Sequence, residues 1–177
     1  MEIKARCKFD LNSMKALTHL SLFKKADPKR RMIFWSVLYI VLAAIMILEI
    51  VLLDAGKDLA FPLFALIVAW CLVFFLYAFM PKIRYNALAN MKEAENEYIF
   101  CDNALKAYTK SQAYNGEAEV QYSLFVKVFE TSRYFFLFQT KNQVFIVDKS
   151  TIEGGTAENI RNKLAPYIKG KYIICKY

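Results

Sequence analysis

The side chains whose chemistry most clearly suggests a function are five basic residues within a stretch of eight positions. Such a cluster attracts anionic lipid headgroups, and each Lys or Arg near a charged membrane surface contributes about 1 kcal/mol. It also orients a neighbouring membrane span, because positively charged loops stay in the cytoplasm. We predict topology as its first role and headgroup contact as its second. The members are Lys24, Lys25, Lys29, Arg30 and Arg31.

Residue types that can catalyse reactions are present, but they do not form a recognisable catalytic motif. His19 is the only histidine, and no nucleophile is visibly placed with it, so we expect a solvated or interfacial side chain. Glu117 and Glu119 share one face of a predicted strand, where paired carboxylates can do acid–base work. In an edge strand, such acids are usually solubilising charges. Gly154-Gly155 indicates a turn, and no nucleotide-binding, metalloprotease or hydrolase motif is present.

The composition points to an anchor in a membrane with a folded part attached. Hydrophobic residues make up 57% of the 177 residues, above the ~45–50% of soluble proteins. The net charge of +8 is unevenly spread, with an excess of positive charge before residue 32 and after residue 80. None of the four cysteines lies in a C-x-x-C pair, which gives no support to a zinc or redox motif. We predict a non-enzymatic protein without a cofactor.

Two apolar stretches are long enough to cross a bilayer as helices, which needs about 20 residues. They span residues 32–53 and 59–80, and the connector of residues 54–58 makes them a hairpin. The connector carries one Lys, whereas the flanks carry the five basic residues together with Lys82 and Arg84. Both termini are therefore predicted to be cytoplasmic. Glu49 lies one helical turn from the outer end, so we interpret it as interfacial rather than as part of an ion pathway.

The polar parts on either side of the hairpin carry regular patterns. Residues 2–9 alternate apolar and polar side chains, which predicts a half-buried strand. We expect this strand to pair with the sheet of residues 97–148 or with residues 171–177, because a lone strand is marginally stable. A helix is predicted from near Ser13 to the Asp-Pro pair at residues 27 and 28. Its apolar stripe would let it dock flat on the membrane or against the sheet. The alternative is a solvated segment whose neighbouring charges only set the orientation of the hairpin.

Beyond the hairpin, the chain reads as a helix, several strands and a second helix. A juxtamembrane helix is predicted over residues 81–96, followed by five or six short antiparallel strands rich in Phe, Tyr and Val. Thr156 can cap a helix over residues 157–168, and residues 171–177 can form a last strand. The predicted domains are residues 1–31, 32–80, 81–96 and 97–177.

These patterns predict an α+β membrane protein. A transmembrane helical hairpin is joined to a small antiparallel β-sheet domain, which a C-terminal helix closes at one end. That second part is the architecture of pleckstrin-homology-like (PH-like) domains.

The segment from Tyr122 to Lys149 resembles the YcxB-like family of bacterial membrane proteins. Three runs carry the resemblance, namely KVFET at residues 127–131, YFFLF at 134–138 and KNQVFIV at 141–147. The order of a short strand and helix, two spans and a β-rich domain also matches. The family often has Trp where Tyr122 stands and Pro where Asp148 stands. The resemblance implies a bacterial inner-membrane protein with a PH-like cytoplasmic domain, and it brings no established activity or ligand.

We therefore expect a multi-pass protein of the bacterial inner (cytoplasmic) membrane, acting as a scaffold, sensor or accessory subunit that binds protein or anionic lipid. The alternative is a subunit of a small transporter or exporter built from oligomerised hairpins. Membrane lipid is the expected partner, with a second protein or a second copy of the chain left open. The interleaved tyrosines and lysines after residue 97 suit a membrane interface better than nucleic acid.

Overall fold

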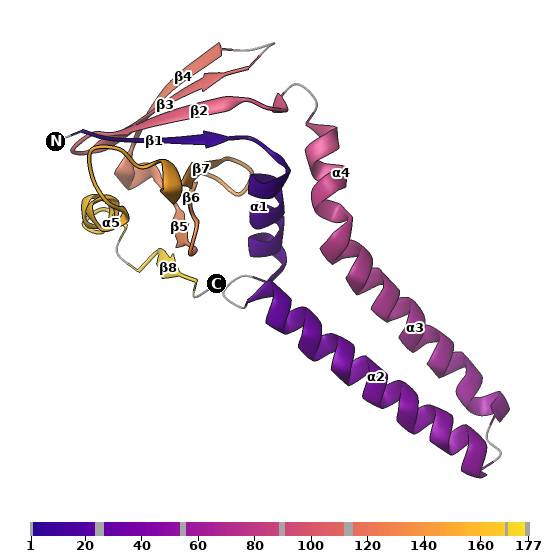
Figure 1. Ribbon diagram of the computed structural model, residues 1–177. Helices are drawn as coiled ribbons and strands as arrows, with labels where there is room; N and C mark the ends of the chain where they lie inside the picture. The colour runs from indigo at the N-terminus through magenta and orange to yellow at the C-terminus, as the bar shows by residue number, and fades with distance from the viewer. Residues whose placement is uncertain are drawn as a thin grey trace.

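The computed structural model consists of a long helical hairpin and a two-sheet β domain, which two shorter helices connect (Figure 1). It describes residues 2–23, 27–53, 56–88, 91–111, 115–168 and 170–175. The N-terminal half contains β1 (Ile3–Lys8), α1 (Leu11–Phe23), α2 (Pro28–Leu53), α3 (Gly56–Ala78) and α4 (Met80–Ala87). The C-terminal half contains β2 (Glu95–Phe100), β3 (Ala104–Lys110), β4 (Asn115–Gln121), β5 (Lys127–Glu130), β6 (Tyr134–Phe138), β7 (Val144–Asp148), α5 (Ala157–Leu164) and β8 (Tyr172–Ile174).

Helices α2 and α3 lie side by side (Figure 1). They expose apolar side chains around their outer faces. Their less exposed residues recur every three or four positions, the spacing of helices that pack along each other. Between them, Trp70 Nε1 donates a hydrogen bond to Ser36 Oγ at 3.5 Å. On the outside, Ile40, Val51 and Phe61 are each about two-thirds exposed or more. Both helices are long and apolar enough to cross a membrane.

The hairpin helices begin a little earlier than the apolar stretches of residues 32–53 and 59–80 suggested. Helix α2 begins at Pro28, a residue that suits the first turn of a helix because its missing N–H would have no partner there. The Asp27 carboxylate accepts a hydrogen bond from the Lys29 backbone N–H at 2.9 Å. The first turn of α2 is therefore polar, and it carries three of the predicted lipid contacts.

The β domain consists of two four-stranded sheets, with the strand orders β1-β2-β3-β4 and β7-β6-β5-β8. All neighbours in the first sheet are antiparallel. In the second sheet, β8 runs parallel to β5, so the prediction of a purely antiparallel sheet is wrong at this edge. The chain reaches β8 through α5, and parallel neighbours need such a long crossover connection.

Strand β1 is hydrogen-bonded on both of its edges and thereby joins the two sheets. On one edge it pairs with β2, with Ile3 opposite Phe100. On the other edge, Lys4 and Glu153 exchange two backbone hydrogen bonds of 3.0 and 2.8 Å. The Thr151 hydroxyl completes this edge by accepting from the Arg6 N–H and donating to the Arg6 carbonyl. The predicted pairing of the N-terminal strand with the sheet is confirmed, and the hairpin is an insertion between two neighbouring strands.

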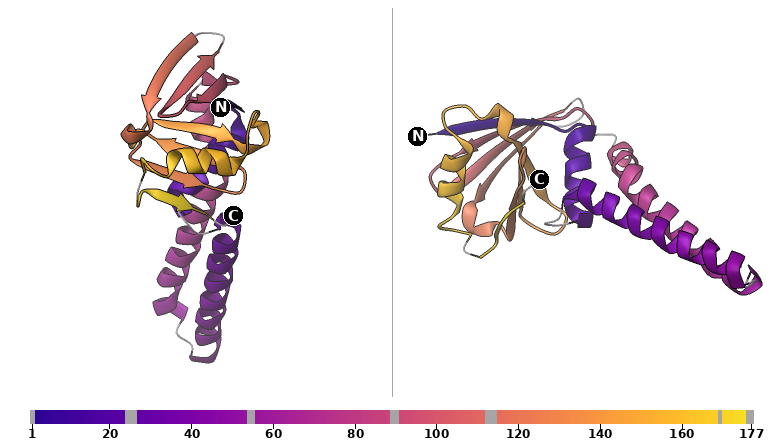
Figure 2. Two further views of the ribbon diagram at one scale, coloured as in Figure 1. Left: turned by 90° about the vertical axis from the view of Figure 1, so that its left-hand side faces the viewer. Right: turned by 60° about the horizontal axis from the view of Figure 1, so that its bottom comes forward.

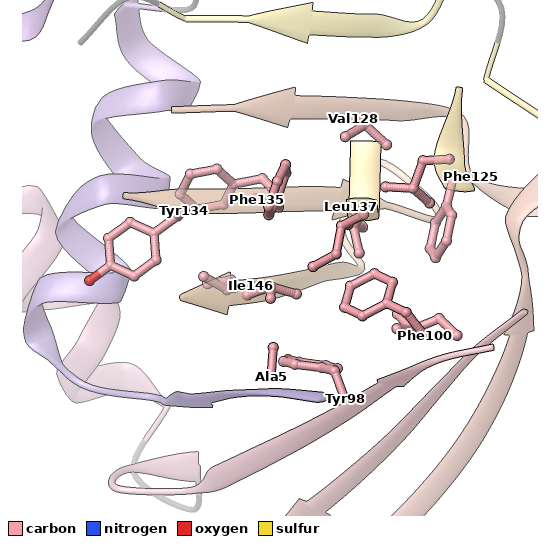
Figure 3. Packing of buried hydrophobic residues seen from close by; sticks show 14 of the residues in the cluster. Ala5, Tyr98, Phe100, Phe125, Val128, Tyr134, Phe135, Leu137 and Ile146 are labelled. Carbon is pink, nitrogen blue, oxygen red and sulfur yellow. The ribbon is translucent and has the colours of Figure 1, made fainter. Parts of the chain in front are cut away.

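The core lies between the inner faces of the sheets, as Figure 3 shows for residues from both. Ala5 of β1 has no exposed surface, and neither do Phe100 of β2 and Leu137 of β6. Strand alternation explains the pattern, because every second residue of β1 is buried. The predicted turn at Gly154-Gly155 is present, and Gly154 adopts a φ of +74° that favours glycine.

Helix α5 closes one end of the space between the sheets (Figure 2). The Thr156 hydroxyl and the Asn159 side chain form a reciprocal capping box, so the predicted cap is confirmed. The helix ends at Leu164, earlier than the predicted residue 168, because Pro166 cannot continue the hydrogen-bond pattern. Ile160 and Leu164 are fully buried beneath it.

Helix α4 ends at Ala87, so the juxtamembrane helix predicted over residues 81–96 is wrong in its second half. Pairing with the end of β1 replaces the helical hydrogen bonds there. Phe9 donates to the Ala94 carbonyl at 2.8 Å, and Glu93 donates to the Phe9 carbonyl at 3.1 Å. The backbone of Glu93 has a φ of 61°, which marks the turn from helix into β2.

We expect that Ala5→Glu will destabilise the β domain by about 3 kcal/mol or more, because it places an unpaired carboxylate in a fully buried position. Lys4→Glu, on the exposed face of the same strand, is the matched control and should have little effect. Calorimetric melting of the full chain in lipid nanodiscs measures both. Equal melting temperatures for the two variants would show that β1 does not complete the core.

Candidate functional site

Five exposed basic residues surround the end of the hairpin nearest the β domain. We call this group the basic collar, and it consists of Lys29, Arg30, Arg31, Lys82 and Arg84. The first three occupy the first turn of α2, and the last two lie on α4, which continues from α3 (Figure 1). The structure thus places two basic segments, with 50 residues of sequence between them, at the same end of the hairpin. The two remaining predicted headgroup contacts, Lys24 and Lys25, lie outside the described residues.

The collar is positioned for contact with anions rather than for internal pairing. The Arg30 side chain is 89% exposed, and its Nε lies 3.7 Å from the Asp27 carboxylate. An exposed ion pair of this kind contributes little to stability. The charge of the collar therefore remains available to a partner in solution or at a membrane surface.

His19 attaches α1 to the hairpin and is buried, so of the two predicted environments the solvated one is wrong. Its ring stacks on Tyr77 of α3 with centroids 4.5 Å apart, and its Nε2 lies 3.2 Å from the Tyr77 carbonyl oxygen. Phe23 contacts the same tyrosine edge-on. Burial lowers the pKa of His19, although the hydrogen bond to Tyr77 opposes this effect. The ring is a packing element between α1 and the hairpin helix α3.

A buried carboxylate links four elements at the closed end of the domain. Glu130, at the end of β5, is 3% exposed. It accepts hydrogen bonds from Arg161 at 3.0 and 2.8 Å, from Lys149 at 2.7 Å and from Tyr172 at 2.5 Å. Burial alone would raise the pKa of Glu130, but these hydrogen bonds outweigh it and lower the pKa to about 2. The carboxylate is fully engaged, so its role is to fasten α5 and β8 to the sheet.

A polar groove of about 700 Å³ lies along β1, β2 and β3 and reaches the end of β7. Its lining is mixed in charge, with Arg6, Lys8, Lys110 and Arg133 opposite Asp10, Glu95, Glu97 and Asp148.

The reactive groups in the polar groove are held in inactive states. Arg133 donates two hydrogen bonds to Asp148, of 3.1 and 3.0 Å. Burial raises the pKa of Asp148, but hydrogen bonds from Ser150 and Arg133 reverse this and lower it. Burial and the nearby Asp148 raise the pKa of the Cys7 thiol to about 12, so it stays protonated. The groove is therefore lined by side chains of both charges, several of them paired with each other, and its Cys7 thiol is not activated as a nucleophile.

Neither Glu117 nor Glu119, the acids considered for catalysis, is among the residues that line the polar groove. Glu119 is on the exposed side of β4, 3.9 Å from Lys106 of the neighbouring strand. This placement agrees with a solubilising role. Among the residues that the structure describes, no group of three or more His, Cys, Asp or Glu side chains is arranged to hold a metal ion.

We expect that Glu130→Gln will destabilise the domain by about 3–5 kcal/mol, because Arg161 and Lys149 lose their buried counter-charge. The pKa of Glu130 is lower in the folded chain than in the unfolded chain, so the unfolded chain takes up a proton first. The stability that Glu130 provides is therefore present above about pH 4.5 and is lost as the pH falls toward 2. Denaturant unfolding between pH 3 and pH 7 measures this difference.

The matched control is Asp102→Asn. It removes an exposed acid that pairs with Lys163, a residue of α5 like Arg161. It should leave stability almost unchanged. A Glu130→Gln variant with the same acid sensitivity as the unmodified protein would contradict the assignment.

Comparison with known proteins places one part of the chain in a family. Residues 102–164 match the family model described as YcxB-like protein. The match begins at the turn between β2 and β3 and ends with α5, so it excludes β1, β2, β8 and the hairpin. Neither a curated protein nor a solved structure gave a significant match. The family predicted from the sequence is thereby confirmed, and residues 102–164 form a YcxB-like domain.

Proposed function

We propose that this protein is a non-enzymatic accessory or scaffold protein of the bacterial inner membrane. In this proposal α2 and α3 cross the membrane as a hairpin, and the β domain rests against the anionic cytoplasmic surface. The observation that carries it is the position of the hairpin, which is inserted between two strands that pair with each other and exposes an apolar surface. Exposed apolar surfaces of this extent mark contact with a membrane or with another protein.

The pairing of β1 with β2 constrains the topology of the hairpin. Strand β1 precedes α2 and α3 in the chain, and β2 follows them. Because the two strands are hydrogen-bonded along their whole length, both flanks of the hairpin lie on the same side of the membrane. The basic collar lies on this side, and positive charge near the ends of spans favours the cytoplasm. The charge pattern and the sheet register therefore support the same arrangement.

The basic collar supports contact of the domain with anionic lipid. Each basic side chain near such a surface contributes about 1 kcal/mol, so several together can hold a domain in place. The collar belongs to α2 and α4, and both helices are joined to the β domain through α1. Headgroup contact at the collar would therefore fix the distance and the tilt of the domain.

A PH-like fold of the β domain agrees with its strand arrangement. Four antiparallel strands are followed by the three strands β5, β6 and β7, and α5 closes one end. In this proposal β8 is an addition at the edge of the second sheet. Domains of this architecture act by binding, which suits a scaffold, a sensor or an accessory subunit.

The position of Glu49 favours this role over that of a transporter subunit. Its side chain is exposed on the hairpin, one helical turn before the end of α2 at Leu53. A charge near the end of a span reaches the interface at low cost, whereas a pathway residue faces the interior of a bundle.

We expect an introduced Gly56→Cys, at the connector end of α3, to be labelled by a membrane-impermeant maleimide in intact spheroplasts. Asn142→Cys, on an exposed turn of the β domain, should be labelled only after permeabilisation. The unmodified chain, with its four native cysteines, gives the background. Labelling of Asn142→Cys from outside would reverse the orientation, and protection of Gly56→Cys until permeabilisation would show that the hairpin does not cross.

We expect hydrogen exchange of α4 to be about fivefold slower in nanodiscs with anionic lipid than in neutral ones, as about 1 kcal/mol implies. A variant in which all five collar residues are changed to Gln should lose this difference. A variant with Lys106, Lys127 and Lys141 changed to Gln, all on the β domain and outside the collar, should keep it. Equal exchange of α4 in both lipids for the unmodified chain would exclude contact between the collar and headgroups.

A further inference from the structure

An apolar groove of about 440 Å³ opens at the end of the β domain that faces α1 and α4. Its volume falls within the ~300–1,000 Å³ typical of small-molecule sites. One wall comes from the sheets, with Tyr98, Ala107 and Phe145, and the other comes from the helices, with Met14, Leu17 and Leu88. Figure 3 shows the Tyr98 side chain directed between the sheets. The groove thus reaches toward the core of the domain.

The groove and α5 lie at opposite ends of the space between the sheets. Helix α5 contacts the end of β2, where Lys163 donates to the Cys101 carbonyl. The groove is lined instead by Phe9, after the end of β1, and by Asn96, near the beginning of β2. One end of the domain is therefore closed by its own helix, and the other keeps an apolar opening next to the hairpin.

A series of exposed apolar side chains connects the hairpin to this opening. Phe79, Ile83, Leu88 and Met91 follow one another in sequence from the end of α3 to beyond the end of α4, and each is between 41% and 51% exposed. The last two line the groove. Leu88 lies about 12 Å beyond Met80 at the rise of a helix, so the opening is close to the proposed membrane surface.

The apolar groove adjoins the polar groove, because Cys7 and Asn96 line both. The polar groove contains basic and acidic side chains in equal number, which complements a headgroup that carries both charges. An apolar space beside a mixed-charge space matches a molecule with one hydrocarbon chain and a zwitterionic end. Continuity with the hairpin identifies the membrane as its source.

We propose that the β domain binds a single-chain zwitterionic lipid of the lysophospholipid class, with the acyl chain in the apolar groove and the headgroup in the polar groove. This inference rests on the proposed membrane insertion of α2 and α3. It adds a specific ligand site to a domain whose proposed contact with bulk lipid is made by the basic collar.

The test is photo-crosslinking of the full chain in nanodiscs with a lysophosphatidylethanolamine that carries a photoactivatable palmitoyl chain. We expect adducts on peptides that contain Met14, Leu17 or Phe145, identified by mass spectrometry. Ala118→Trp places a large side chain in the exposed mouth of the groove and should reduce these adducts at least tenfold. Gln121→Trp, on the opposite face of the same strand, is the matched control and should retain them.

Adducts on α2 and α3 report membrane insertion in the same experiment, so the two proposals fail separately. Absence of adducts on the hairpin would overturn the proposed insertion. Hairpin adducts without groove adducts, or groove adducts that persist in Ala118→Trp, would overturn the lipid site. Slow hydrogen exchange of the groove peptides that becomes fast when the chain is diluted to a monomer would identify a second copy of the chain as the occupant. This result would also overturn the lipid site.

Discussion

Both edges of strand β1 are hydrogen-bonded, one to β2 and the other to the segment of Thr151 and Glu153. This double pairing holds the two sheets together, because the first sheet reaches the second through β1. It also fixes the hairpin, since β1 leads into α1 and α2 while its partner β2 follows α4. The segment that matches the YcxB-like family contains neither β1 nor β2. The folded unit is therefore larger than the segment that sequence comparison identifies.

The two ends of the β domain are built for different purposes. At the closed end, Glu130 gathers two cations and a tyrosine hydroxyl, and α5 covers the core. A buried charge with all its partners in place gives a rigid end, because moving any partner would leave an unpaired charge. At the other end, apolar and polar grooves meet beside the helices, where the domain joins the hairpin. The β domain therefore has one end that is held rigidly and one end that is open to a ligand, and both ends share the same core.

The features that depend on local sequence could be predicted, and those that depend on distant contacts could not. The two long apolar helices, the N-terminal strand and the cap at Thr156 follow from local sequence patterns. The partners of His19 and Glu130 are 58 and up to 42 residues away, so no local pattern reveals them. The helix predicted up to residue 96 ends at Ala87, because hydrogen bonds to Phe9 compete with the helical ones. The only hint of the buried network in the sequence is that Glu130 is an acid in a largely apolar strand.

The insertion of the hairpin between β1 and β2 has a consequence for biosynthesis. The ribosome makes β1 first and β2 only after both long helices have been completed. The core around Ala5 therefore cannot close until the hairpin has left the ribosome. In the proposed membrane arrangement, a chain in which only one helix has inserted holds β1 and β2 on opposite sides of the bilayer. Such a chain cannot form its first sheet, so folding of the β domain serves as a check that the hairpin is correctly placed.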